Sequence, residues 1–188
     1  MPTEYTVQQG WHLLKTNYWI KNEAGEDVYH VEGTNFTWGV QNTLKDKEGK
    51  ELASIRQTKV VTFYPKFEVF RDGKMWATCT KENFIGFGKK EALLDIPGDN
   101  NYKIKGNKYA AAFEIVRTET GNLAGTVKKR SGDILRDKYV VSIEDGEDEI
   151  ALIIIFCLID GIYHDVDGGE NDLVLNAFAT EMSKAPIK

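Results

Sequence analysis

The segment Glu149-Ile-Ala-Leu-Ile-Ile-Ile-Phe-Cys-Leu-Ile159 contains the longest unbroken apolar run in the chain. A transmembrane helix needs about 20 apolar residues to cross about 30 Å of hydrocarbon. The run Ile150–Ile159 has ten and is followed by Asp160 and Gly161, so we expect no transmembrane span. A buried strand is one alternative, because isoleucine favours β structure. The other alternative is a helix that is apolar on every side and therefore buried on every side.

The acidic segment Asp145-Gly-Glu-Asp-Glu149 lies immediately before this run and favours the helix. An aspartate at the N-cap accepts hydrogen bonds from the first backbone N–H groups, and further carboxylates are stabilised by the positive end of the helix dipole. The sequence therefore predicts a helix over about 147–163. We interpret these acids as capping groups and not as a metal site.

The rest of the chain repeats a hairpin pattern of two alternating β-type runs around a polar turn that ends in glycine. Four segments show it: 18–31, 44–55, 67–79 and 113–127, with turn glycines at 25, 49, 73 and 121. Pro97-Gly98 stands near the position where a further unit is expected, and Asp145-Gly146 is a sixth turn signal. Glycine at such positions supplies the positive φ that tight hairpins need.

Further strand-like stretches lie between these hairpins, at 34–40, 59–64, 83–87 and 138–143. About a dozen short strands without intervening helices indicate a sandwich or a barrel. A barrel of about twelve strands is too wide to be filled by its own side chains, and an apolar helix on its axis would fill it. We predict a mainly β domain at 1–164, a closed antiparallel barrel of hairpins around this central helix, and an acidic turn with a C-terminal extension at 165–188.

This order of features resembles the LURP-one-related family, whose fold is shared with the tubby C-terminal domain and the phospholipid scramblases. The resemblance is carried by hairpins 44–56 and 67–79 with Tyr64-Pro65 between them, by 128–141, and by the terminal acidic turn and apolar helix. It implies a twelve-stranded barrel around a central helix and no enzymatic activity or cofactor. Tubby domains bind phosphoinositides and scramblases are linked to lipid movement, so the resemblance also suggests contact with lipid.

Basic residues gather near the end of the chain's β region. Five cations fall within eleven positions: Lys128, Lys129, Arg130, Arg136 and Lys138. On two strands joined by a turn they would form one face that binds anionic lipid headgroups, such as phosphoinositides, each cation contributing about 1 kcal/mol near an anionic surface. The alternative is a solvated strand edge, where lysines prevent sheets from associating. Lys103 and Lys105, which would share a sheet face, together with Lys108 allow the same two interpretations.

Metal and catalytic motifs are weak. Asp165, Asp167, Glu170 and Asp172 begin like a calcium loop, but Gly169 and Glu170 stand where a ligand and a glycine are required. A mobile acidic turn is the better interpretation. Two cysteines, Cys79 and Cys157, cannot build a disulfide framework. The three histidines are scattered, and neither a nucleophile elbow nor a phosphate-binding glycine loop occurs.

Composition restricts the classes of function. The net charge of −5 does not favour nucleic acid as a partner. The N-terminus lacks the features of a secretory signal, so a cytoplasmic location, with possible peripheral attachment to a membrane, is expected. We predict a non-catalytic binding or adaptor domain that contacts anionic lipid or a partner protein. A scramblase-like lipid mover and a barrel that binds a small molecule remain as alternatives.

Overall fold

The computed structural model describes residues 1–9, 17–36, 39–58, 66–81, 90–97, 101–106, 112–130 and 138–163. These residues form twelve strands and one helix. In chain order the elements are β1 (Thr3–Gln9), β2 (Asn17–Lys21), β3 (Asp27–Phe36), β4 (Gly39–Asp46), β5 (Glu51–Gln57), β6 (Lys66–Arg71), β7 (Lys74–Lys81), β8 (Lys90–Asp95), β9 (Tyr102–Gly106), β10 (Ala112–Arg117), β11 (Leu123–Arg130), β12 (Lys138–Ile143) and α1 (Glu149–Tyr163).

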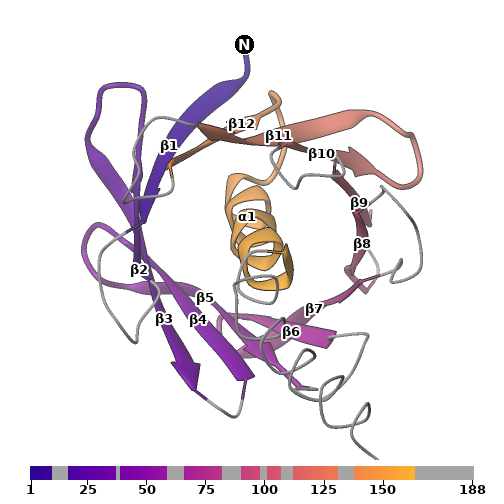
Figure 1. Cartoon of the computed structure of the whole chain (residues 1–188), viewed down its shortest axis with the longest axis horizontal. Coiled ribbons are helices and arrows are strands. Elements are labelled where there is room, and N and C mark those ends of the chain that lie inside the picture. The colour runs from indigo at the N-terminus through magenta and orange to yellow at the C-terminus, as the bar shows by residue number, and fades with distance from the viewer. Residues whose placement is uncertain are drawn as a thin grey trace, which may run out of the picture.

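The strands form a closed antiparallel barrel in which every strand pairs with its neighbours in sequence (Figure 1). The first strand closes it: Thr3 of β1 lies opposite Ile143 of β12, and Gln9 of β1 lies opposite Tyr18 of β2. Closure matters physically because it leaves no unpaired strand edge. The predicted barrel of about twelve hairpin-built strands is confirmed.

The turn glycines lie where the repeat predicts them. Gly73 has φ 69° and follows Asp72 at φ 50°, so both residues between β6 and β7 are in the left-handed region that a two-residue hairpin turn requires. No atom lies within 4 Å of the position that a Cβ on Gly73 would occupy, so backbone conformation, and not space, requires glycine there. Gly25, Gly49, Gly121 and Gly146 also have positive φ.

One predicted strand is wrong in its bounds. The stretch 34–40 does not form a single strand, because β3 ends at Phe36 and β4 begins at Gly39, and these two residues face each other across the pair. The chain reversal between β3 and β4 is not recognisable in the sequence, because aromatic and β-branched residues surround it and no Asn-Gly or Asp-Gly signal marks it. The predicted strands at 59–64 and 83–87 lie outside the described residues, as does the turn glycine Gly98.

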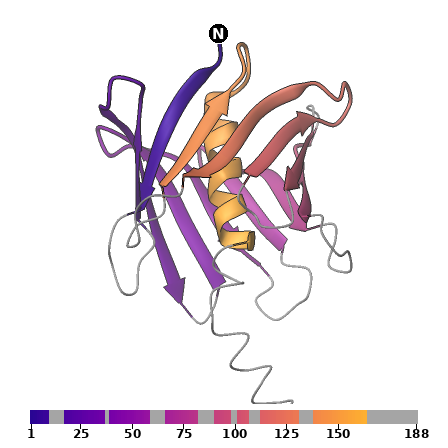
Figure 2. The same ribbon diagram turned by 45° about the horizontal axis from the view of Figure 1, so that its top comes forward.

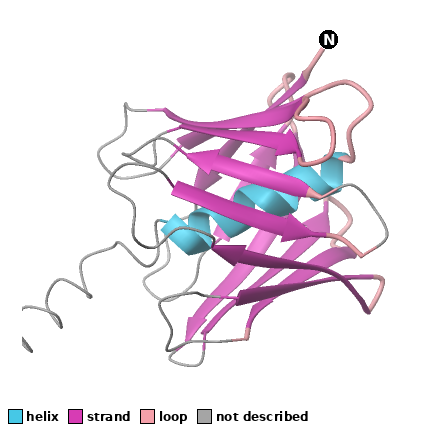
Figure 3. Ribbon diagram, turned by 90° about the vertical axis from the view of Figure 1, so that its right-hand side faces the viewer, coloured by secondary structure: helices cyan, strands magenta, loops and turns pink. Residues whose placement is uncertain are grey.

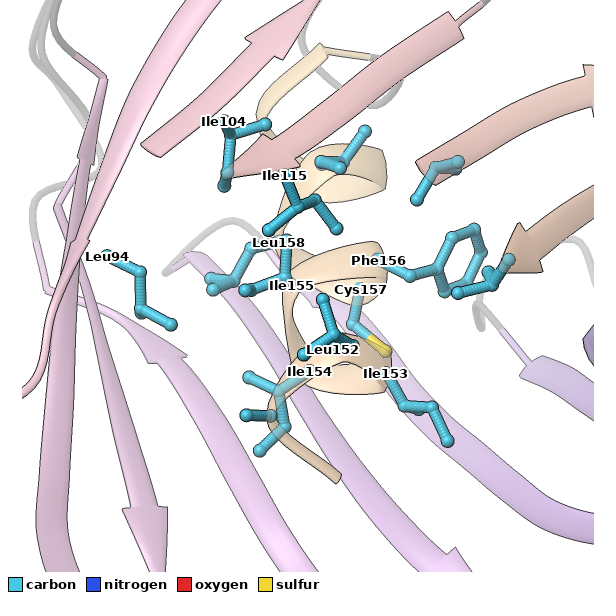
Figure 4. Packing of buried hydrophobic residues seen from close by; sticks show 14 of the residues in the cluster. Leu94, Ile104, Ile115, Leu152, Ile153, Ile154, Ile155, Phe156, Cys157 and Leu158 are labelled. Atoms are coloured by element: carbon cyan, nitrogen blue, oxygen red, sulfur yellow. The ribbon is translucent and has the colours of Figure 1, made fainter. Parts of the chain in front are cut away.

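Helix α1 runs through the inside of the barrel, as Figures 1 and 2 show. Residues 151–159 are all buried, with at most 2% of each exposed. The ring of Phe156 meets Tyr18 of β2 edge-on at 5.5 Å between centroids and Tyr139 of β12 at 5.2 Å. Figure 4 shows helix side chains directed to different parts of the wall. The buried strand alternative for this segment is therefore wrong, and the central helix is confirmed.

The wall approaches the helix closely at Gly125 of β11. A Cβ on this residue would lie 2.6 Å from the backbone oxygen of Ser142 and 3.2 Å from Cδ1 of Leu152. The first distance is too short for any side chain without a backbone shift. Glycine at this position therefore lets α1 pack directly against β11 and β12.

The N-terminus of α1 is capped as the acidic segment predicts. The Asp148 carboxylate accepts a hydrogen bond from the backbone N–H of Ala151 at 3.1 Å, and the Asp148 carbonyl accepts the one from Leu152 at 3.1 Å. Asp148 is thus the N-cap residue. Its carboxylate also lies 2.5 Å from the guanidinium of Arg71 on β6.

The two neighbouring carboxylates contact other parts of the wall. Glu147 binds Arg117 of β10 and accepts a hydrogen bond from the Tyr102 hydroxyl of β9 at 3.0 Å. Glu149 accepts a hydrogen bond from the hydroxyl of Tyr29 on β3. Three consecutive acids therefore tie the start of the helix to strands on different sides of the barrel.

The barrel has two ends that differ in character. We call the end where α1 begins the hairpin end, because the turns at Gly25, Gly49, Gly73 and Gly121 lie there (Figure 3). We call the other the helix-exit end, because α1 finishes there. The strand direction places the last residues of β11 and the first residues of β12 at the helix-exit end.

Candidate anion-binding surface

Strands β11 and β12 bring three of the predicted basic residues onto one outer face. Lys128 lies opposite Val140, and Arg130 lies opposite Lys138. Side chains alternate between the two faces of a strand. Val127 of β11 and Tyr139 of β12 are buried toward the helix. The residues next to each of them along its own strand therefore point outward. We call Lys128, Arg130 and Lys138 the β11–β12 basic surface.

Lys129 does not belong to this outer face. It lies opposite Tyr139 in the register, and its Nζ lies 5.9 Å from the centre of the Tyr139 ring. That ring packs on Phe156 inside the barrel, so Lys129 projects on the inner side of the wall at the helix-exit end. The prediction of a single face shared by Lys128 and Lys129 is therefore wrong. The strand period of two separates neighbours in sequence, and Arg136 lies outside the described residues.

The basic residues do not protect an exposed strand edge. Strand β11 is paired with β10 on one side and β12 on the other, and Lys128 has partners on both, Ala112 and Val140. A closed barrel has no edge on which a second sheet could add. These cations therefore lie on a solvent-exposed outer face of the barrel and not at a strand edge.

The strand register brings two cations of this surface together. Arg130 and Lys138 are directly opposed, and like charges in cross-strand pairs are destabilising. In the described part of the chain, neither Lys128 nor Arg130 forms an ion pair. Elsewhere on the outer wall lysines and arginines do, as in Lys45–Glu32 at 2.8 Å and Arg56–Glu68 at 3.0 Å. Lys128 and Arg130 are thus able to accept an external anion.

The second basic stretch is different. Lys103 and Lys105 alternate with the buried Tyr102 and Ile104 and so share the outer face of β9, as the alternation predicts. Lys105 stands in register with acidic residues on both sides, Glu91 of β8 and Glu114 of β10. This arrangement makes Lys105 a weaker candidate for a discrete anion site than Arg130. Lys108 lies outside the described residues.

The structure gives the other candidates no new support. The weak calcium candidates Asp165, Asp167, Glu170 and Asp172 lie outside the described residues. Among the residues that are described, no three His, Cys, Asp or Glu side chains gather as a metal site would require.

Both cysteines are in the core as free thiols. Cys79 of β7 and Cys157 of α1 are buried, as the apolar sequence around Cys157 indicates. Burial raises the pKa of the Cys79 thiol to about 12. A thiolate at this position is therefore scarce near neutral pH.

Helix length bears on the membrane question. Within the described ranges, α1 at 15 residues is the longest helix, and no helix there combines the length and hydropathy needed to cross a bilayer.

The chain is similar to two known proteins and matches one family model. It is 26% identical over 165 residues to the uncharacterized protein YxjI of Bacillus subtilis (strain 168), covering 87% of this chain and 96% of that protein. Its fold is similar to the X-ray structure of a protein from Arabidopsis thaliana, with a TM-score of 0.60, 13% identity, and coverage of 86% of this chain and 91% of the other. The family model described as LURP-one-related matches residues 3–160. The chain therefore belongs to the LURP-one-related family.

Proposed function

We propose that this chain is a non-catalytic binding domain that contacts phosphate groups of anionic lipid headgroups through the β11–β12 basic surface. The observation that supports this most strongly is the direct opposition of Arg130 and Lys138 on adjacent strands. Two cations placed side by side in this way concentrate positive charge on a small area, which favours an anion there. Arginine suits this role because its guanidinium donates paired hydrogen bonds to phosphate.

The position of the cations also supports a surface that is always accessible. Lys128, Lys129 and Arg130 are exposed in the last three positions of β11. Arg130 therefore meets an anionic headgroup without any change in the barrel. Binding of this kind needs no catalytic residue, because the ligand is held by charge and hydrogen bonds alone.

The burial of α1 argues against the scramblase-like alternative. That mechanism requires the helix to leave the barrel and meet lipid, yet residues 151–159 all pack against the wall. Removing them would expose nine buried side chains, each large one worth about 1.5–3 kcal/mol of burial. The proposed binding role needs no such release.

The experiment is flotation of the full chain with vesicles that contain phosphatidylinositol bisphosphate. The triple variant Lys128→Ala, Arg130→Ala, Lys138→Ala removes the β11–β12 basic surface and should lower affinity on the order of 100-fold, since each cation contributes about 1 kcal/mol. Binding by the unchanged chain should weaken as salt rises. The matched control is Lys47→Ala, Lys50→Ala, Lys74→Ala at the hairpin end, which removes the same charge from turns on the other side of the barrel.

Equal vesicle binding by the triple variant and the unchanged chain would exclude this face. Loss of binding in both triple variants would assign the effect to net charge alone. Capture of a phosphate-free acidic protein, with no vesicle binding by the unchanged chain, would replace lipid by a protein partner.

A further inference from the structure

The β11–β12 basic surface continues around the barrel wall into an aromatic pair. Closure of the barrel pairs β12 with β1, and β1 also pairs with β2. Gln8 of β1 lies opposite Lys138 on one side and opposite Trp19 of β2 on the other. Trp19 in turn lies opposite His30 of β3. Each of these residues alternates with buried neighbours along its strand, so they share the outer face. We call this series across five strands the outer row: Arg130, Lys138, Gln8, Trp19 and His30.

Trp19 presents an exposed indole ring on this part of the wall. Its residue is 45% exposed, whereas its neighbours Tyr18 and Ile20 on β2 are fully buried. Among the exposed large apolar side chains in the described ranges, Trp19 is the only aromatic one. Its ring stacks on the imidazole of His30, with 4.0 Å between the ring centroids and 14° between the ring planes. The stack holds the indole in one orientation, so little side-chain entropy is lost when it meets a partner.

The aromatic pair and its surroundings on β3 are close to neutral. Burial lowers the pKa of His30, so its imidazole is uncharged near pH 7. Strand β3 carries two acids, and each is bound to a lysine of a neighbouring strand. Asp27 is 2.6 Å from Lys21 of β2, and Glu32 is 2.8 Å from Lys45 of β4. The outer row is therefore apolar and neutral at its β2–β3 end.

The strands that carry the rest of the outer row contain few acids. Strands β1, β2, β11 and β12 together have a single acidic residue, Glu4, which lies four positions from Gln8 toward the hairpin end. The same strands have five basic residues, one in β2, three in β11 and one in β12. This side of the wall is therefore positive and favours an anionic partner.

We propose that this side of the wall docks on an anionic bilayer, with Trp19 in the headgroup layer and the β11–β12 basic surface against lipid phosphates. This inference rests on the proposed function and adds a second element to the same contact. Neighbouring strands lie about 4.8 Å apart, so the backbone of Trp19 is about 10 Å from that of Lys138 and about 14 Å from that of Arg130. One phosphate does not span this distance, whereas a bilayer presents many headgroups side by side.

The chemistry of tryptophan fits the boundary between water and lipid. Its ring is apolar but carries an N–H donor, and tryptophan is enriched at the level of the headgroups in membrane proteins. At that depth the indole leaves water while the basic side chains reach phosphates, so both contacts form together. The barrel then lies with its side toward the membrane. Strand β7 is on the far side, because it is six strands from β1 in the closed order of twelve (Figure 1).

The first test is flotation of the full chain with vesicles of phosphatidylcholine and phosphatidylinositol bisphosphate. Trp19→Ala should bind on the order of tenfold more weakly than the unchanged chain, because the indole no longer leaves water. This ratio should persist as salt rises, since the indole contributes through burial and not through charge. The matched control is Met75→Ala, which removes a 60% exposed apolar side chain from β7 on the far side and should bind within about twofold of the unchanged chain. Far-ultraviolet circular dichroism checks that both variants are folded.

The second test reports the orientation directly. A dye is attached to a cysteine introduced by Thr6→Cys on β1 or by Thr80→Cys on β7. Thr6 lies opposite Lys21 and Val140 in the register and lines an open depression on the outer wall, and Thr80 is exposed. The two native cysteines are buried. Lipids with a headgroup nitroxide should quench the dye at position 6 severalfold more than the dye at position 80.

The outcomes separate this inference from the proposed function. If the triple variant of the β11–β12 basic surface loses vesicle binding while Trp19→Ala binds like the unchanged chain, the role of Trp19 is wrong and the proposed function stands. Equal weakening by Trp19→Ala and Met75→Ala would also exclude a specific role for Trp19. If the two dyes are quenched equally, the orientation is wrong. If the unchanged chain does not bind the vesicles, the proposed function fails together with its extension.

Discussion

Arg117 of β10 and Glu147 form an ion pair that joins the barrel wall to the turn before α1. The guanidinium Nη2 lies 2.6 Å from Oε2 of Glu147, and Nε lies 3.0 and 3.1 Å from the two carboxylate oxygens. The two side chains are 20% and 13% exposed, and the guanidinium also lies 4.8 Å from the centre of the Tyr102 ring. Such a contact fixes the helix start in both position and direction.

The substitution Glu147→Gln should destabilise the fold by about 2–3 kcal/mol, because it leaves a largely buried guanidinium without its counter-charge. The measurement is the free energy of unfolding in urea at pH 7. Lys21→Ala breaks an ion pair of similar length, 2.6 Å to Asp27, but on a more exposed part of the wall. It should cost less than about 1 kcal/mol. Equal losses in the two variants would contradict a structural role for Arg117–Glu147.

Alkaline pH should unfold the protein through the phenols around the same turn. Burial, followed by the hydrogen bond to Glu149, raises the pKa of Tyr5 and Tyr29, and burial with the hydrogen bond to Glu147 does the same for Tyr102. Because these pKa values exceed the ordinary value of about 10 in the folded state, the protonated phenols stabilise the fold below pH 10. That stabilisation is lost as pH rises above 10.

Absorbance at 295 nm during an alkaline titration measures the ionisation of the tyrosine phenols. We expect these three of the eight tyrosines to ionise above pH 10, together with loss of the far-ultraviolet circular dichroism signal. Tyr102→Phe should remove from the titration one of the phenols that ionise above pH 10. Ionisation of all phenols near pH 10 with the circular dichroism signal intact would refute the prediction.

Much of this fold is readable from the sequence because its elements are determined locally. Positive φ at Gly73 and an acidic N-cap within 145–149 depend on residues next to each other, and both were predicted; the structure places the N-cap at Asp148, two residues later than the predicted helix start implies. The helix inside the barrel followed from volume, since twelve strands enclose more space than their own side chains fill.

The features that sequence missed depend on closure and register. Arg117 and Glu147 are 30 positions apart and Arg71 and Asp148 are 77 apart, and only the closed barrel brings each pair together. No local pattern gives such contacts. The inward position of Lys129 is a different case, because the alternation of the buried Val127 with its neighbours already contained it.

Neither cysteine should react with an aromatic disulfide reagent at pH 8 while the protein is folded. Cys79 is buried and has a pKa of about 12 because of that burial, so almost no thiolate is present, and Cys157 is 2% exposed. Both thiols should react within minutes in guanidinium. The absorbance of the released aromatic thiolate at 412 nm measures the number of thiols that react in the folded and the unfolded chain. The Thr120→Cys variant is the control, because it supplies one exposed thiol. Reaction of two thiols in the folded chain would show that α1 leaves the barrel readily.

Phe156→Ala should destabilise the fold by about 3–5 kcal/mol, because it removes a fully buried ring from between Tyr18 and Tyr139 and leaves a cavity. Phe156→Leu is the matched control: it keeps most of the buried area but loses the edge-on ring contacts, and it should cost less than half as much. Urea unfolding monitored by circular dichroism measures both. The difference between the two variants reports how tightly the helix is held in the wall. If alanine cost no more than leucine, the space around Phe156 would have to collapse freely, which a wall closed by twelve paired strands does not allow.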